Sequence, residues 1–144
     1  MRPASLQTLI RVRRQAVDAA SLHLSACLET EAASNDAVRA QAADINRQRA
    51  AAESATSGDG AVEAFGLWYP PAQDRLRALA ARHQRTMEET ARARAQLSAA
   101  RTALEVAETL WREAARARQA KALADAQKQI DEAAARRGPG GDVC

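Results

Sequence analysis

Few residues of this chain have a type and spacing that could do chemistry. Its two histidines, His23 and His83, lie far apart, and neither belongs to a HExxH or similar ligand spacing. The two cysteines, Cys27 and Cys144, are unpatterned, so they predict neither a disulfide framework nor a zinc site, and a reducing cytoplasm is expected. We therefore expect no metal and no cofactor.

Phosphate and acid–base chemistry are also poorly supported. The turn-like run 58–60 lacks the lysine and the flanking strand that a phosphate-binding loop needs. The paired acids 88–89 and 131–132 lie in helix-like sequence without an enclosing pocket, whereas a general acid needs an environment that tunes its pKa. The sequence therefore argues against an enzyme and for a protein that acts through its surface.

The composition favours long helices. Alanine occupies 38 of the 144 positions, and phenylalanine, tryptophan and tyrosine together occupy four. Such a chain lacks the bulk for a multilayer core, but alanine favours the helix and lets two helices approach closely. The length suits one domain, and no window approaches the ~18 apolar residues of a membrane span.

Charge is mixed along the chain, with a formal net value of +3. The excess of basic residues lies in the second half, where 72–137 contains fourteen basic and nine acidic side chains. This excess could favour an acidic partner or an anionic lipid surface. On sequence alone, however, a solvated helix face with mixed charges is the preferred interpretation.

A spacing of alternating four and three residues predicts a coiled-coil seam in each half of the chain. Apolar residues fill nine of fourteen such positions in the first half and eight of eleven in the second. The first set is Leu6, Ile10, Arg13, Val17, Ala20, Leu24, Cys27, Glu31, Ser34, Val38, Gln41, Ile45, Gln48 and Ala52. The second set is Leu76, Leu79, His83, Thr86, Thr90, Ala93, Leu97, Ala100, Leu104, Ala107 and Trp111. Beyond Trp111 the spacing continues through Ala115, Ala122, Ala126, Ile130 and Ala133 only after an inserted step of four residues.

The predicted fold is all-α, a single antiparallel coiled-coil hairpin over 1–137. Its helices are expected at about 5–56 and 72–137, joined by a connection over about 57–71 and followed by a flexible tail over 138–144. Ser5 is the expected cap of the first helix, and the two prolines at 70–71 are expected to start the second. The helices differ in length, so one terminus should extend as an unpaired helix.

The seam is weakest at Glu31 and Ser34 in the first helix and at 83–90 in the second. With the expected connection, 83–90 would face about 41–48, which makes the half of the hairpin near the connection the softer one. Basic runs at 11–14 and 136–137 lie near the two termini, and in such a hairpin they would meet in one electropositive tip.

Three segments resemble the flagellar FliJ family, the small coiled-coil protein of the flagellar type III export apparatus. The run 6–14 followed by Val17 and Asp18 resembles the start of these proteins, and 65–69 followed by Leu76 and Leu79 resembles their aromatic middle. The closing run 129–137 is similar to the end of the family. The order of the three segments and their distances from both termini also agree.

The resemblance implies a non-enzymatic component of flagellum biogenesis. Family members form the central stalk of the hexameric export ATPase, contact the membrane-embedded export gate and handle export chaperones, at the cytoplasmic face of the membrane. Carried over by position, the residues expected to face the ATPase ring are Arg13, Arg14, Asp131, Glu132, Arg136 and Arg137. Leu76 and Leu79 are expected to face the gate, and Arg75 stands where many family members have an aromatic residue.

Three alternatives remain from the sequence. One is the equivalent stalk of a virulence or symbiosis type III injection system, which would share the hairpin. Another is a generic coiled-coil scaffold. The third is a helical protein that binds nucleic acid, which the arginine excess permits but which the near absence of aromatic residues from the basic runs disfavours. We expect no nucleic-acid partner.

Overall fold

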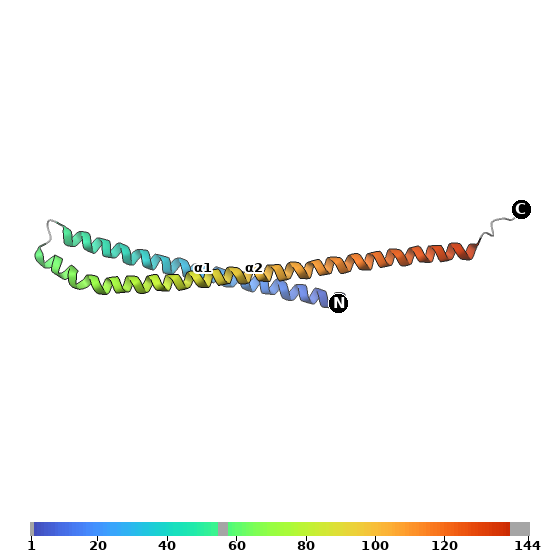
Figure 1. The fold of residues 1–144 in the computed structure, drawn as a ribbon, viewed down its shortest axis with the longest axis horizontal. Helices are drawn as coiled ribbons and strands as arrows, with labels where there is room; N and C mark the ends of the chain where they lie inside the picture. The colour runs from blue at the N-terminus through green and yellow to red at the C-terminus, as the bar shows by residue number, and fades with distance from the viewer. Residues whose placement is uncertain (1, 55–57, 139–144) are drawn as a thin grey trace. The chain divides into compact units, whose positions relative to one another are not determined.

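The computed structural model describes residues 2–54 and 58–138. Over these ranges the chain forms two long helices and no strand, α1 (Pro3–Glu53) and α2 (Asp59–Arg137), which pack against each other (Figure 1). The all-α hairpin prediction is confirmed. The chain divides into two compact units, a hairpin unit (Val17–Ala100) and a terminal unit (Met1–Ala16 with Arg101–Cys144). The predicted tail beyond 138 lies outside the described residues.

The helix ends follow local backbone chemistry. Pro3 opens α1, where its missing N–H costs nothing, and the carbonyl of Arg2 accepts from the amides of Ser5 and Leu6 at 3.0 and 3.2 Å. Ser5 therefore lies inside the first turn and is not the predicted cap. Gly138 ends α2 with a φ of 58°, and its amide donates to the carbonyl of Ala135 at 3.2 Å.

The predicted connection over 57–71 is wrong, because α2 begins at Asp59 and contains Pro70 and Pro71 in its interior. The two prolines leave the carbonyls of Gly66 and Leu67 without their usual amide donors. Both of these residues are exposed, so water can solvate the two carbonyls. The ribbon of α2 bends in this part (Figure 1), as expected for proline inside a helix.

Burial follows the predicted seam closely. Every seam position from Leu76 to Trp111 is at least half-buried, and so is every position of the first set except Arg13 and Gln48. Alanines are among the most buried residues, with Ala93 and Ala107 at 0% and 1% exposure. Small residues at these positions allow the two helices to approach closely, which replaces bulk as the source of packing.

The early start of α2 shifts the register of the hairpin unit. The side chain of Gln41 donates to the carbonyl of Ala72 at 3.2 Å, and Thr90 Oγ1 donates to the carbonyl of Cys27 at 3.4 Å. The segment 83–90 therefore faces 27–34, and the expectation that it faces 41–48 is wrong. Because α2 starts thirteen residues before the predicted position, each of its residues meets an earlier residue of α1.

The last part of α2 has no helix opposite it. All residues from Arg116 to Gly138 are exposed, including Leu123 at 65% and Ile130 at 62%. The prediction of an unpaired helical terminus is confirmed. The seam does not continue through Ala122, because α1 begins at Pro3 and offers no residue that could pair with this part of α2. We call residues 116–137 the unpaired segment.

The unpaired segment contains features that stabilise a helix by itself. Its alanines have the highest helix propensity, and Lys121 and Lys128 stand four residues before Asp125 and Glu132. The side chain of Gln127 donates to Asp131 Oδ1 at 3.0 Å across one turn. Local interactions of this kind allow a helix to persist without a buried face.

Candidate functional site

The basic run near the start of α1 lies along the paired part of the terminal unit. Arg14 Nη2 lies 3.2 Å from Glu108 Oε1 of α2, and both side chains are partly exposed. An exposed ion pair of this kind contributes about 0–1 kcal/mol. The pair is informative about the register of the two helices, because it shows that Glu108 of α2 lies beside Arg14. The neighbouring Arg13 is exposed despite its seam position.

The other four residues predicted to face the ATPase ring lie on the unpaired segment. Asp131, Glu132, Arg136 and Arg137 are all exposed. Arg136 follows Glu108 by 28 residues, a distance of about 42 Å along a helix. The expectation that the two basic runs meet in one electropositive tip is therefore wrong. The reason is that α2 continues well past the start of α1.

The unpaired segment accounts for the net charge of the chain. It contains six basic and three acidic side chains, an excess of three that equals the formal net charge of the whole sequence. The last turn holds Arg136 and Arg137, where positive charge favourably offsets the negative end of the helix dipole. The segment is therefore an exposed, basic, single helix.

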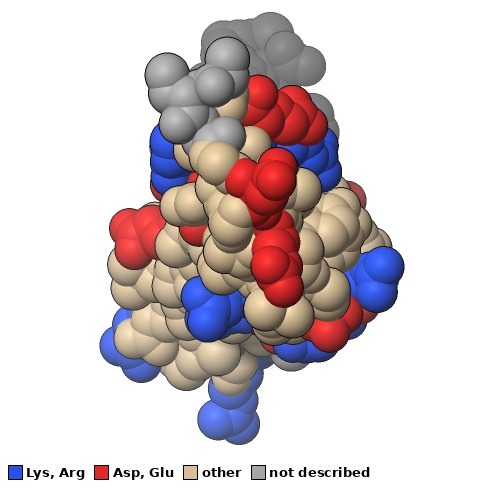
Figure 2. All heavy atoms as spheres, turned by 90° about the vertical axis from the view of Figure 1, so that its left-hand side faces the viewer, with Lys and Arg blue, Asp and Glu red and all other residues tan. Residues whose placement is uncertain are grey.

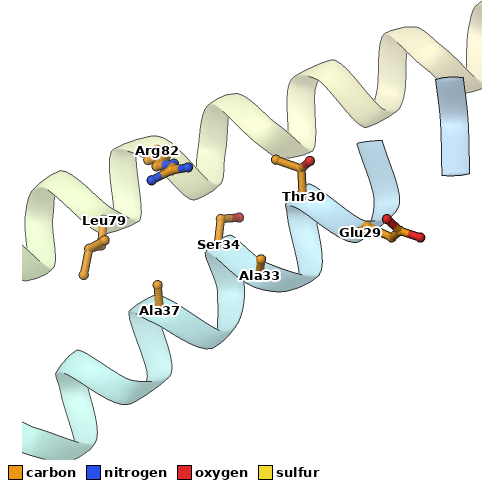
Figure 3. A pocket seen from close by; sticks show the side chains of 7 residues that line it. All are labelled: Glu29, Thr30, Ala33, Ser34, Ala37, Leu79 and Arg82. Atoms are coloured by element: carbon orange, nitrogen blue, oxygen red, sulfur yellow. The ribbon is translucent and has the colours of Figure 1, made fainter. Parts of the chain in front are cut away.

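The two residues predicted to face the export gate lie on the seam side of α2, where both are half-buried. Leu79 lines a groove of about 450 Å³ in the hairpin unit, together with Arg82 of α2 (Figure 3). The α1 wall of this groove consists of Glu29, Thr30, Ala33, Ser34 and Ala37. Leu76 packs one turn earlier in the seam. Leu79, but not Leu76, therefore lines this groove.

Beside this groove lies a buried polar cluster, formed by Ser34, His83 and Thr86. Ser34 Oγ is 2.9 Å from His83 Nδ1 and 2.7 Å from Thr86 Oγ1, and it donates to the carbonyl of Glu31 at 2.8 Å. Ser34 and Thr86 are each 6% exposed. One turn further, Thr90 is fully buried, and its one hydroxyl proton is shared between the carbonyl of Thr86 at 3.0 Å and the carbonyl of Cys27 at 3.4 Å. The positions that looked weak in sequence thus bond to one another across the seam.

The two hydroxyls of the cluster share their protons among several acceptors. Thr86 Oγ1 lies 2.7 Å from the carbonyl of His83 and 2.7 Å from Ser34 Oγ, which also contacts the carbonyl of Glu31. Each hydroxyl has one proton, and a carbonyl can only accept. The contacts of Ser34 with His83 and Thr86 join α1 and α2 in this register.

The aromatic residues near the start of α2 pack on each other and on α1. The Phe65 ring centroid lies 5.9 Å from that of Trp68 and 5.4 Å from that of Tyr69. The Arg49 guanidinium lies 5.6 Å from the centre of the Tyr69 ring. The rings therefore pack on one another and on α1, whereas Leu67 remains 77% exposed.

The end of the hairpin unit that contains these rings has no concentrated charge of one sign. Seen from that end, acidic side chains form a row among uncharged surface, and both acidic and basic side chains lie to either side of it (Figure 2). A second groove of about 330 Å³ lies between Phe65 and Trp68 of α2 and the alanines 51 and 52 of α1. The charge asymmetry of the chain therefore belongs to the unpaired segment.

The contact between His23 and Cys27 in the hairpin unit was not predicted from the sequence. Cys27 Sγ lies 3.7 Å from His23 Nε2 on the same face of α1. Their spacing of four residues is the signal that could have revealed it, since such residues are neighbours on a helix. Within the described parts of the chain, no group of three or more His, Cys, Asp or Glu side chains could hold a metal ion.

The seam, the cross-helix contacts and the unpaired segment define the class of the protein as a two-helix coiled-coil-like hairpin with one extended terminus. Over the residues that the structure describes, neither helix has a stretch apolar enough to cross a membrane. Comparison of the chain with protein-family models, curated proteins and solved structures gives no match.

Proposed function

We propose that this protein is a non-enzymatic stalk of the flagellar type III export apparatus, which binds the hexameric export ATPase and stimulates it. The resemblance of three segments to the FliJ family motivates this proposal, and the unpaired segment of α2 is the observation that supports it best. A hexameric ring has a narrow centre, and one helix with its side chains is only about 10–12 Å wide. A single exposed helix is therefore better suited to entering a ring than a helix pair.

The geometry divides the expected ring contacts into two levels. Asp131, Glu132, Arg136 and Arg137 would enter first, because they lie at the end of the unpaired segment. Arg13 and Arg14 lie about 35–44 Å behind them along α2, at the level of Glu108. The excess positive charge of the segment favours a ring lined by carboxylates, and interspersed acids prevent one deep electrostatic minimum.

The remaining partners follow from the same resemblance. The groove beside Leu79 is the proposed contact for the membrane-embedded export gate, and the exposed helix surfaces offer sites for export chaperones. In this proposal the protein is cytoplasmic and peripheral to the inner face of the membrane. No nucleic acid and no cofactor take part.

The test is ATP turnover and mass of the cognate flagellar export ATPase, with the full chain and with a chain that ends at Ala115. We expect the full chain to shift the ATPase toward a hexamer and to raise turnover at substoichiometric amounts. The shortened chain keeps the paired helices but should fail to do either. A full chain that changes neither mass nor turnover would overturn the proposal, and an equally active shortened chain would remove the unpaired segment from it.

A further inference from the structure

The pair His23 and Cys27 stands apart from every surface used above. Both residues lie in the hairpin unit on α1, four positions apart, with His23 exposed and Cys27 half-buried. The sulfur lies 3.7 Å from Nε2 of the imidazole. The proposed export function gives no role to either side chain. A test of these two residues is therefore separate from the test of the export function.

The geometry points to a chelate for a thiophilic metal ion, with Zn²⁺ as the divalent case, bound by Cys27 Sγ and His23 Nε2. A tetrahedral zinc ion with a Zn–S bond of about 2.3 Å and a Zn–N bond of about 2.0–2.1 Å holds the two donors about 3.6 Å apart. The observed separation of 3.7 Å is almost the same. The metal would therefore bind with little rearrangement of either side chain.

The surrounding structure fixes the backbone that carries the two donors. Residues four apart on a helix share one face, which is the same spacing that places two histidines on one zinc in the HExxH helix. The carbonyl of Cys27 accepts from Thr90 Oγ1 at 3.4 Å, which ties this turn of α1 to α2. Because Nε2 faces the sulfur, Nδ1 remains directed elsewhere and can hold the ring orientation through water.

The donor set selects the class of metal. A thiolate with an imidazole favours Zn²⁺, Cd²⁺ and Cu⁺ over the oxygen-seeking Mg²⁺ and Ca²⁺. The thiol of Cys27 loses its proton to solvent as the metal–sulfur bond forms. Two protein donors leave two positions of a tetrahedral ion, which water or donors from another molecule can fill.

The test uses the full chain carrying Cys144→Ser, so that Cys27 is the single thiol, reduced and free of metal. Co²⁺ serves as the probe, because its bond to a thiolate gives a charge-transfer absorption band, and Zn²⁺ is then added as a competitor. We expect Co²⁺ to produce the band and Zn²⁺ to remove it. Loss of the band in Cys27→Ser identifies the sulfur.

The decisive variant is His23→Ala, which removes one of the two protein donors. Its affinity for the metal should fall by about tenfold or more, since even outer-shell partners of a metal ligand change affinity about 10- to 100-fold. His83→Asn changes the other histidine and should leave the affinity unchanged, with circular dichroism confirming helicity in each case. No thiolate band in the single-cysteine chain, or equal affinity without His23, would overturn the chelate.

Discussion

At the scale of single residues, the polar cluster converts a weak stretch of seam into a specific one. Ser34, His83 and Thr86 each have a partner across or along the seam, so each depends on the others. Replacing Ser34 by alanine removes the partner of His83 Nδ1 across the seam, whereas the Thr86 hydroxyl keeps the carbonyl of His83 at 2.7 Å as its acceptor. An unsatisfied buried polar group costs about 1–3 kcal/mol, and we expect Ser34→Ala to lower the free energy of unfolding by this amount in urea denaturation.

The matching control distinguishes a lost hydrogen bond from lost packing. Thr8→Ala removes a hydroxyl that donates to the carbonyl of Ala4 at 3.0 Å on an exposed face, and it should change stability by less than about 0.5 kcal/mol. The triple change Ser34→Ala, His83→Leu and Thr86→Val removes all partners together. It should recover most of the lost stability, because apolar replacement of a whole polar set is nearly neutral. A triple variant less stable than Ser34→Ala would show that the polar set itself stabilises the seam.

At the scale of elements, the prolines of α2 are a local conflict that the helix tolerates. Pro70 and Pro71 lie in the helix interior, where each is about 3 kcal/mol less favourable than alanine. The double change to alanine supplies two amides for the carbonyls of Gly66 and Leu67. We expect it to raise the free energy of unfolding by about 1–3 kcal/mol, less than the sum, because the bent helix already solvates these carbonyls. Pro3→Ala, at the first helical position, should have little effect.

Removal of the unpaired segment, in contrast, is expected to leave the stability of the hairpin almost unchanged. Residues 116–137 are all exposed, so a chain that ends at Ala115 loses no buried side chain, although it loses the contact of the Arg118 guanidinium with the Trp111 ring, 5.3 Å from its centre. Its free energy of unfolding should equal that of the full chain to within about 1 kcal/mol, the value of an exposed cation–π contact. Amide exchange should be fast over the segment and slow around Ala93 and Leu97, which are nearly fully buried. Stability that falls by several kcal/mol on truncation would mean that the segment packs against something.

The elements also explain which features the sequence could predict. Seam positions were predictable because alternating apolar spacing requires the helices to bury that face, and burial follows it from Leu6 to Trp111. The start of α2 was not predictable, because Pro70 and Pro71 locally favour a helix boundary. In the structure the helix continues through them, with the rings around Phe65 packed together before the prolines and Ala72 buried after them. The wrong start of α2 shifted the predicted register of the two helices, so the contact of Ser34 with His83 was not predicted.

For the candidate site, the six residues predicted to face the ATPase ring are exposed and Leu79 lines a groove, whereas Leu76 is half-buried in the seam. The predicted proximity of the two basic runs was wrong. Arg14 and Arg136 were expected in one tip, and the unequal helix lengths separate them. The sequence already contains those lengths, so a correct α2 start would have predicted the separation. The contact of His23 with Cys27 needed only their spacing of four.

At the scale of the whole molecule, charge and pairing are segregated, since the net charge lies where no helix is paired. This segregation gives the export proposal an electrostatic test that depends on position. Reversal of Arg136 and Arg137 to glutamate changes the leading end of the unpaired segment, whereas reversal of Arg13 and Arg14 changes the paired part and breaks the contact with Glu108. If the segment enters an acidic ring first, reversal of Arg136 and Arg137 should weaken ATPase binding by about tenfold or more, and reversal of Arg13 and Arg14 should weaken it by less.

The affinity of the unchanged protein for the ATPase should also fall as salt rises, because exposed charges are screened over about 10 Å at 0.1 M. Equal losses for both pairs would favour a ring contact spread along both helices, and no loss for Arg136 and Arg137 would exclude entry through this end.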